Sequence, residues 1–378
     1  MSVWDDVVGQ EAAVAALRAA VADPAAMTHA WLITGPPGSG RSNAARAFAA
    51  ALQCLESGCG HCLACTTALA GTHADVTVVA TETVGIKIEE TRSLVSLAQR
   101  APSGGRWRVI LVEDADRMAE RTSNVLLKAI EEPPPRTVWL LCAPSPQDVV
   151  VTIRSRARSV ALRVPPVAAV AALLVARDGV DPHVAELAAR AAQSHIGIAR
   201  RLARDSGARE RRDQVLAIPG TIRGVGDAVL AAGRLVEVSQ LESKAATEHR
   251  DAAEKSALLR AIGAEGAATL PPSLRAQVNQ LEKDQKGRAT RAQRDVLDRS
   301  MIDLLSLYRD VLVVQLGAGV DLVNAGAQEQ VRALAAASTP EQTLRRMDAI
   351  GAARTRLGGN VAPLLAMEAM TIALRPQG

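Results

Sequence analysis

The stretch GPPGSGRS, residues 35–42, follows the apolar run AWLIT and precedes an alanine-rich run typical of a helix. It differs at one residue from the phosphate-binding loop G-x-x-x-x-G-K-[ST], because Arg41 stands where that pattern has lysine. In such loops glycines let backbone N–H groups approach phosphate, and the following helix adds positive potential. We therefore predict a nucleotide site, in which the Ser/Thr hydroxyl would bind Mg²⁺. Its candidate residues are Gly35, Pro36, Pro37, Gly38, Ser39, Gly40, Arg41 and Ser42.

Five short apolar runs alternate with helical patterns over the first 165 residues. They are apolar on both faces, as the strands of a covered parallel sheet are. Strands that alternate with helices indicate βαβ units. We therefore expect an α/β domain with a parallel sheet over residues 1–165. The predicted strands are 29–35, 75–81, 108–114, 138–144 and 159–164.

The remainder of the chain is helical in pattern. Pro165 and Pro166 end the strand–helix alternation, and short amphipathic patterns continue to about residue 208. The charged stretch 206–213 reads as a linker, and two long helices are predicted beyond it. We expect a small helical domain and then an all-α domain. The expected ranges are 166–208 for the small domain, 209–378 for the all-α domain, and 234–262 and 274–316 for the long helices.

Composition limits the function classes. The 378 residues are 48% hydrophobic and 22% charged, and no apolar run reaches the roughly 20 residues of a membrane span. The first residues, MSVWDDVVGQ, lack the basic and apolar regions of a signal peptide, so we expect a cytoplasmic protein. A net charge of +4 allows nucleic-acid contact without requiring it. Only six aromatic residues argue against binding single strands by base stacking.

A partner motif for the phosphate loop lies at VILVEDADRM, residues 109–118. Here an apolar strand would end at Glu113 and Asp114, which could hold Mg²⁺ and orient water. These two carboxylates complete the predicted nucleotide site.

Four of the five cysteines lie within twelve residues: Cys54, Cys59, Cys62 and Cys65. Four thiolates this close can surround one Zn²⁺ tetrahedrally, and a site with no open position is structural rather than catalytic. The alternatives are His61 as a competing ligand, an iron–sulfur cluster, or free cysteines packed in a helical hairpin. Cys142 stands alone in an apolar run, which predicts a buried thiol.

Several motifs occur in the order found in bacterial clamp-loader subunits. Besides the loop, the cysteines and VILVEDADRM, these are VVGQEAAVAAL (7–17), SNVLLKAIEEPP (123–134) and IRSRAR (153–158). Together they make residues 1–165 similar to that family, and within it to the delta-prime branch of DNA polymerase III. The helical remainder is similar only in size and general pattern.

The resemblance implies an AAA+ nucleotide-fold domain, a helical lid and a collar domain that assembles into an open ring. The implied partners are the tau/gamma and delta subunits, and, through the complex, the sliding clamp and primed DNA, with no membrane. Delta-prime subunits are generally poor or inactive ATPases that contribute an arginine finger to a neighbour. Arg156 stands at the arginine of the family's SRC motif, here Ser-Arg-Ala. Arg200 or Arg201 would be a second sensor arginine, and a zinc module after the loop helix is also implied.

Three departures from the ATPase pattern favour the delta-prime branch. Arg41 replaces lysine with a larger, forked group. Glu113-Asp114 inverts the usual Asp-Glu order, and catalysis that depends on positioning is sensitive to such a change. The γ-phosphate sensor position falls at Ala143 or Pro144, with Ser145 nearby. We expect weak or absent hydrolysis, with ATP or ADP and Mg²⁺ still possible ligands.

Two other function classes stay open. One is an active tau/gamma-type ATPase that tolerates arginine in its loop, which rapid turnover by the isolated chain would favour. The other is a stand-alone zinc-bearing nucleic-acid binder, which predicts tight DNA binding without partners.

Overall fold

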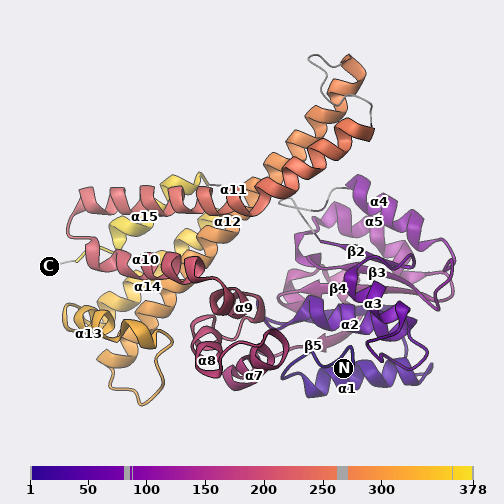
Figure 1. Ribbon diagram of the computed structural model, residues 1–378, viewed down its shortest axis with the longest axis horizontal. Coiled ribbons are helices and arrows are strands. Elements are labelled where there is room, and N and C mark those ends of the chain that lie inside the picture. Colours follow the sequence, from indigo (N-terminus) through magenta and orange to yellow (C-terminus); the bar gives the residue numbers. More distant parts are fainter. Residues whose placement is uncertain (1, 81–85, 87, 262–270, 360, 377–378) are drawn as a thin grey trace. The chain divides into compact units, whose positions relative to one another are not determined.

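The computed structural model describes residues 2–80, 86, 88–261, 271–359 and 361–376 (Figure 1). The chain divides into two compact units, Met1–Arg204 and Asp205–Gly378. None of the helices in the described ranges is long and apolar enough to cross a membrane. The first unit holds a parallel sheet and the second is helical, so the predicted fold class is confirmed. The domain boundaries after residues 165 and 208 stay predictions.

The sheet has five parallel strands in the order β2-β3-β4-β1-β5. All five predicted strands are present, although residue 81 of the second lies outside the described residues. The strands are β1 Ala30–Thr34, β2 Val76–Val79, β3 Arg108–Val112, β4 Thr137–Ala143 and β5 Arg158–Ala161. The helices of this unit are α1 Glu11–Ala22, α2 Arg41–Gln53, α3 Leu63–Ala70, α4 Ile88–Ala98, α5 Glu120–Glu131, α6 Val151–Arg154, α7 Val167–Asp178, α8 Pro182–Ala191 and α9 Ile196–Arg204.

Both faces of the sheet are covered, which is why its strands read as continuous apolar runs. Trp31 and Ile33 of β1 pack with Phe48 of α2 in one cluster, which also holds the inner face of α1. Leu32, between them in β1, packs in a second cluster with Leu126 of α5. Every residue of β1, β3 and β4 is buried. Between the end of β1 at Thr34, in the sheet, and the start of α2 at Arg41, on one of its faces, the chain forms the phosphate loop.

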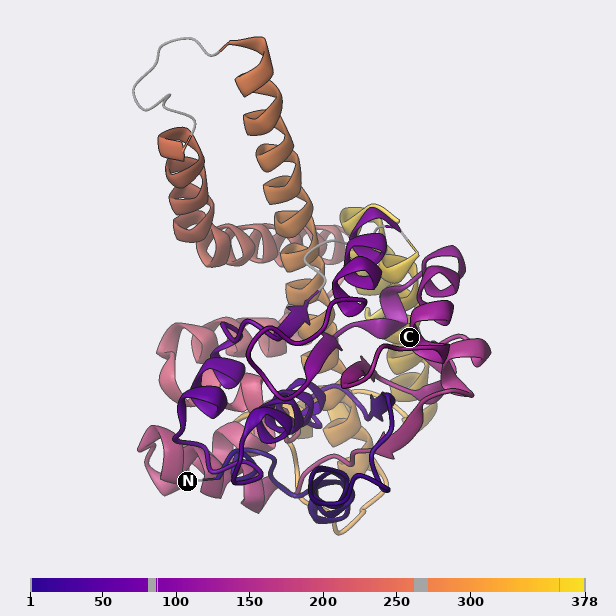
Figure 2. The same ribbon diagram turned by 90° about the vertical axis from the view of Figure 1, so that its right-hand side faces the viewer.

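The second unit consists of helices in its described residues. The two long helices were predicted, and they extend together beyond the others of their unit (Figure 2). The carboxyl-terminal half of the second long helix packs through Leu297, Met301 and Tyr308 against Ile350 and Met367. The helices are α10 Ser206–Thr221, α11 Val225–Ala261, α12 Pro272–Gln315, α13 Gln328–Ala336, α14 Pro340–Gly358 and α15 Pro363–Ala373.

Residues 206–213, predicted as a hinge or linker, are not a linker, because they form the first half of α10, which begins just after the division between the two units. The side chain of Asp205 caps this helix by accepting a hydrogen bond from the N–H of Ala208 at 3.1 Å. The Arg212 guanidinium pairs with Asp303 of α12 at 2.8 Å. Charged residues that looked like linker composition therefore serve as a cap and as interhelical partners.

A buried carboxylate fixes the loop before β3. Asp75 is fully buried, and its oxygens accept hydrogen bonds from the N–H groups of Ser103 at 2.8 Å and Gly104 at 3.0 Å. Arg108, also buried, pairs with it at 3.0 Å. Burial by itself would raise the pKa of Asp75, but these hydrogen bonds hold the pKa well below its ordinary value. The stability they supply is present above the pKa of the unfolded chain and is lost as pH falls toward the folded-state pKa.

We expect Asp75→Asn to lower the free energy of unfolding by about 3–5 kcal/mol, because it leaves the Arg108 charge buried without its partner. Urea unfolding of the full chain at neutral pH measures the loss. Glu90→Gln, at an exposed position of α4, is the matched control and should change stability by less than about 0.5 kcal/mol. Equal stability of Asp75→Asn and the control would contradict the structural role of the pair.

Candidate nucleotide and metal sites

The phosphate loop has the backbone of an anion cradle. Gly38 and Gly40 have φ angles of 89° and 86°, which side-chain-bearing residues rarely adopt. A Cβ atom on Gly38 would lie 2.7 Å from the Cα atom of His195, so the residue before α9 approaches the loop too closely for any residue other than glycine. α2 starts at Arg41 directly after the loop. The N–H groups of its first turn point toward the loop, as phosphate binding requires.

A pocket of about 410 Å³ lies above this loop, within the range of small-ligand pockets. Six of the eight predicted loop residues line it, from Pro37 to Ser42, and they are joined by side chains from α7 and α9. The residues that complete the lining are Asn43, Arg177, His195, Ile196, Gly197 and Arg200. Sequence reasoning missed His195 and Arg177. The one available signal was Gly38, whose close approach to another segment shows only in the folded chain.

Arg41 does not reproduce the geometry of a loop lysine. Its Nη1 atom donates a hydrogen bond to the carbonyl oxygen of Gly35 in the same loop. The Ser39 hydroxyl, in a residue only 2% exposed, has no hydrogen-bond partner among the described residues. Among the described residues, the Ser39 hydroxyl of the loop is therefore buried without a hydrogen-bond partner, and the Arg41 guanidinium is bonded to the loop's own backbone.

The two predicted carboxylates lie outside the pocket lining. Glu113 Oε1 accepts from both Nε and Nη2 of Arg46 on α2, each at 2.9 Å. Asp114 lies 3.9 Å from the Arg117 guanidinium. Sequence reasoning missed Asp116 nearby, whose pKa is raised by burial and by the charge of Asp114. The structure therefore places the loop residues around one pocket, whereas Glu113 lies outside that pocket in an ion pair with Arg46.

The residues predicted at the two sensor positions differ in their burial and in their hydrogen-bond partners. Ala143 is buried at the end of β4, where its carbonyl accepts from the Gly35 N–H at 3.3 Å. The Ser145 hydroxyl is used in its own turn, where it accepts from the N–H of Gln147 at 3.4 Å. Arg200 lines the pocket and Arg201 does not. The Arg200 guanidinium pairs with Asp178 at 2.7 Å.

Arg156 lies on the exposed turn between α6 and β5. Its Nε atom is 2.5 Å from Glu131 Oε1 at the end of α5, and both side chains are 40% exposed. Its Nη1 atom also donates to the carbonyl of Thr152 at 2.9 Å. Exposed ion pairs contribute only about 0.2–1 kcal/mol, so the guanidinium can leave Glu131 at little cost.

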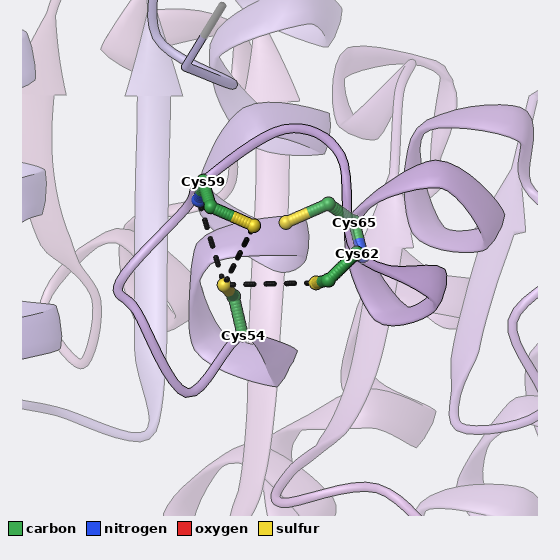
Figure 3. Close-up of side chains that lie close together, drawn as sticks. All are labelled: Cys54, Cys59, Cys62 and Cys65. Carbon is green, nitrogen blue, oxygen red and sulfur yellow. Dashed lines mark hydrogen bonds between the residues drawn. The ribbon is translucent and has the colours of Figure 1, made fainter.

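The four predicted cysteines form one cluster that extends from the end of α2 into the first turn of α3 (Figure 3). The sulfur of Cys54 is 3.7 Å from that of Cys59 and 3.8 Å from that of Cys62, and all four lie within 4.8 Å of one another. These separations are too long for disulfides. A tetrahedron with Zn–S bonds of about 2.3 Å has edges of about 3.8 Å, so the sulfurs fit a single tetrahedral ion. The cluster can therefore hold a metal.

Backbone hydrogen bonds tune the thiols. Burial raises the pKa of Cys54, but N–H donors that include Glu56 at 3.3 Å and Cys59 at 3.5 Å bring it down to about 6. Burial raises the pKa of Cys65, and the neighbouring thiols raise it further. A cation among the sulfurs would offset the repulsion between thiolates. His61 is exposed beside Cys59 and forms, with Glu56 and Cys59, a second possible ligand group. Cys142 is buried in β4, as expected.

Comparisons with known proteins agree with the motifs. The family described as DNA polymerase III, delta subunit, matches residues 9–166. The DNA polymerase III gamma/tau subunit of Mycobacterium tuberculosis is 33% identical over 174 residues, which are 45% of this chain and 30% of that protein. The delta' subunit of Pseudomonas aeruginosa is 39% identical over 148 residues, which are 37% of this chain and 45% of that protein. The chain thus spans less than half the length of these relatives.

Solved structures resemble the chain more distantly. A DNA polymerase III gamma subunit-related protein from Thermotoga maritima is 15% identical with a TM-score of 0.43, and the alignment covers 95% of this chain and 98% of that one. The Orc1 protein of Aeropyrum pernix, solved with DNA, is 16% identical with a TM-score of 0.38, covering 77% and 88% of the two chains. The similarity to clamp-loader subunits rests on the sequence matches. Through residues 9–166, the chain is similar to subunits of the DNA polymerase III clamp loader.

Proposed function

We propose that this protein is a delta-prime-like subunit of a bacterial clamp loader, acting in the cytoplasm. The observation that carries the proposal is the family match over residues 9–166, the stretch that holds the phosphate loop and the Arg156 turn. Its partners in this proposal are tau/gamma and delta subunits, with the sliding clamp and primed DNA engaged through the complex. Arg156 acts on the nucleotide of a neighbouring subunit, and this chain hydrolyses ATP weakly or not at all.

The weak-hydrolysis part of the proposal is supported by the geometry around the loop. A hydrolysing site needs a carboxylate on Mg²⁺ and another group that orients water. Here Glu113 is paired with Arg46, and the Arg41 guanidinium is bonded to Gly35. The hydroxyl of Ser145 is engaged in its own turn. Arg41, Glu113 and the sensor position all lie at or after the carboxyl ends of strands, so the three differences from the ATPase pattern lie at one edge of the sheet.

An active tau/gamma-type ATPase is the second candidate, because gamma/tau subunits are among the relatives that match this chain. The two candidates differ in the turnover of the isolated chain. We expect ATP turnover at background level for wild type and for Arg41→Lys, since lysine restores one group and leaves Glu113 paired. A steady-state phosphate-release assay on the purified chain measures this. Rapid hydrolysis by the wild-type chain would replace the first candidate with the second.

We further propose that the four-cysteine cluster binds one structural Zn²⁺. The sulfur separations of 3.7 and 3.8 Å support this choice, because they suit a tetrahedral ion. Cys54, Cys59, Cys62 and Cys65 would be the ligands. They leave no open coordination position, so the ion would hold the loop between α2 and α3 rather than perform chemistry.

Reconstitution tests the proposed function. Tau/gamma and delta subunits, the clamp and primed DNA are combined with and without this full-length chain, and clamp loading is measured. We expect loading to require the chain. Efficient loading without it, or an assembly that excludes it, would refute the proposal.

A further inference from the structure

The pocket above the phosphate loop is cationic on every side that carries a charge. Among the residues that the structure describes, the charged side chains of its lining are those of Arg41, Arg177 and Arg200, and it includes no aspartate or glutamate. Loop backbone N–H groups and the first turn of α2 add positive potential. A pocket built this way attracts anions, and its lining offers no carboxylate to a metal ion.

The arginines keep part of their charge available. Asp178, whose side chain is 3% exposed, lies 3.4 Å from Arg177, 2.7 Å from Arg200 and 3.7 Å from Arg204. Asp6 lies 3.7 Å from Arg177. Two of these guanidinium groups, Arg177 and Arg200, line the pocket, whereas neither carboxylate does, so the side chains that face the pocket from this wall are cations.

The base of the pocket carries a polar group with no described use. The Ser39 hydroxyl is buried without a hydrogen-bond partner among the described residues, and it belongs to the lining. Buried hydroxyls that stay unpaired are unfavourable, so such a group points to a missing ligand. A phosphate oxygen in the cradle would supply the acceptor that the hydroxyl lacks.

Mg²⁺ has no ligand of its preferred kind in this pocket. Mg²⁺ sites combine one or two carboxylates with substrate phosphates. Glu113 could be such a carboxylate, but it lies outside the lining. Its Oε1 atom is also paired with the Nε and Nη2 atoms of Arg46, each at 2.9 Å. The Ser42 hydroxyl by itself is a weak Mg²⁺ ligand compared with a charged oxygen.

We propose that this pocket binds a diphosphate group as a metal-free anion, and that Mg²⁺ weakens binding instead of strengthening it. The group belongs either to a nucleoside diphosphate or to free pyrophosphate, which share the same charged oxygens. The inference deepens the proposed function, yet it rests on the loop and its arginines and does not require a clamp loader. Because Mg²⁺ neutralises two charges on the diphosphate, it removes attraction to the arginines and gains no carboxylate ligand from the pocket in return.

Isothermal titration of the purified full-length chain tests the proposal. ADP, pyrophosphate and adenosine are each titrated in EDTA and in saturating Mg²⁺. We expect ADP or pyrophosphate to bind in EDTA, with a Kd that rises roughly fivefold or more in Mg²⁺. A lower Kd for ADP assigns the site to a nucleotide, and a lower Kd for pyrophosphate assigns it to the free anion. Tighter binding in Mg²⁺, no binding in EDTA, or adenosine binding as tightly as ADP would each overturn the proposal.

Matched variants locate the binding. Arg41→Met should raise the metal-free Kd about tenfold, because it removes one of the three guanidinium charges that line the pocket. Arg190→Met is the control, since Arg190 pairs with Glu186 on α8 at 2.8 Å and is not in the pocket lining. Circular dichroism confirms that both variants fold. Equal losses in the two variants would mean binding elsewhere and overturn the assignment. The titration uses the isolated chain, so a failed loader reconstitution leaves its result intact.

Discussion

Arg156→Ala is expected to lower ATP turnover at the neighbouring site of a reconstituted loader by about a thousandfold or more. An arginine supplied in trans stabilises the charge that develops in phosphoryl transfer, and its loss costs about 10³–10⁵ in rate where it has been measured. The Arg156 guanidinium can leave its present partners at little cost, because its pair with Glu131 is 40% exposed on both sides and its hydrogen bond to the Thr152 carbonyl is also exposed. Arg156→Lys should recover little, since an ammonium lacks the planar fork.

The measurement needs a loader in which only the adjoining tau/gamma site is competent, so that other sites do not mask the loss. Arg154→Ala is the matched control. It removes an arginine two residues away, whose Nη1 atom donates to the carbonyl of Pro146 at 3.3 Å within its own domain. Assembly is checked by gel filtration for both variants. Wild-type turnover by an assembled Arg156→Ala loader would remove Arg156 from the mechanism.

Loss of a cysteine ligand is expected to have the largest effect on stability. Structural Zn²⁺ supplies an apparent 10–16 kcal/mol in isolated zinc-finger peptides, and we expect Cys59→Ala to cost on the order of 5 kcal/mol in this larger domain. The cysteine loop also holds the start of the chain. The Gly58 carbonyl accepts from the N–H of Val3 at 3.1 Å, and the Ser57 carbonyl from Trp4 Nε1 at 3.5 Å. Metal removal should therefore expose Trp4, which is 4% exposed in the folded chain.

Three measurements check this prediction: elemental analysis, thermal unfolding and tryptophan fluorescence with and without a chelator. We expect one zinc per wild-type chain, none in Cys59→Ala, and a red-shifted emission after chelation. Cys142→Ala also removes one thiol, but from buried β4, and should keep its zinc. Iron in place of zinc would favour the iron–sulfur alternative. A folded chain without any metal would refute the site.

Much of the architecture could be predicted because local patterns and global packing agree. The runs at β1, β3 and β4 are buried on both faces, so their composition alone marks them as strands of a covered sheet. The cysteine cluster was also predictable, since its ligands are close in sequence and a short loop brings them together. The stretch 206–213 was mistaken for a linker, because a charge that caps a helix or pairs with a distant helix looks the same in sequence as a solvated one.

The sequence by itself indicated the similarity to clamp-loader subunits, the parallel sheet, the glycine-rich loop and the cluster of four cysteines, because each depends on residues that are neighbours along the chain. Only the tertiary structure decided what surrounds the loop. Arg46 forms an ion pair with Glu113. His195, which precedes α9, lies against Gly38, and Arg200 of α9 lines the pocket. These contacts join segments that are about 70 to 160 residues apart, and no local periodicity encodes such pairings. GPPGSGRS therefore predicts a phosphate-binding loop, while the packing of α7 and α9 against it determines which charged side chains surround the loop.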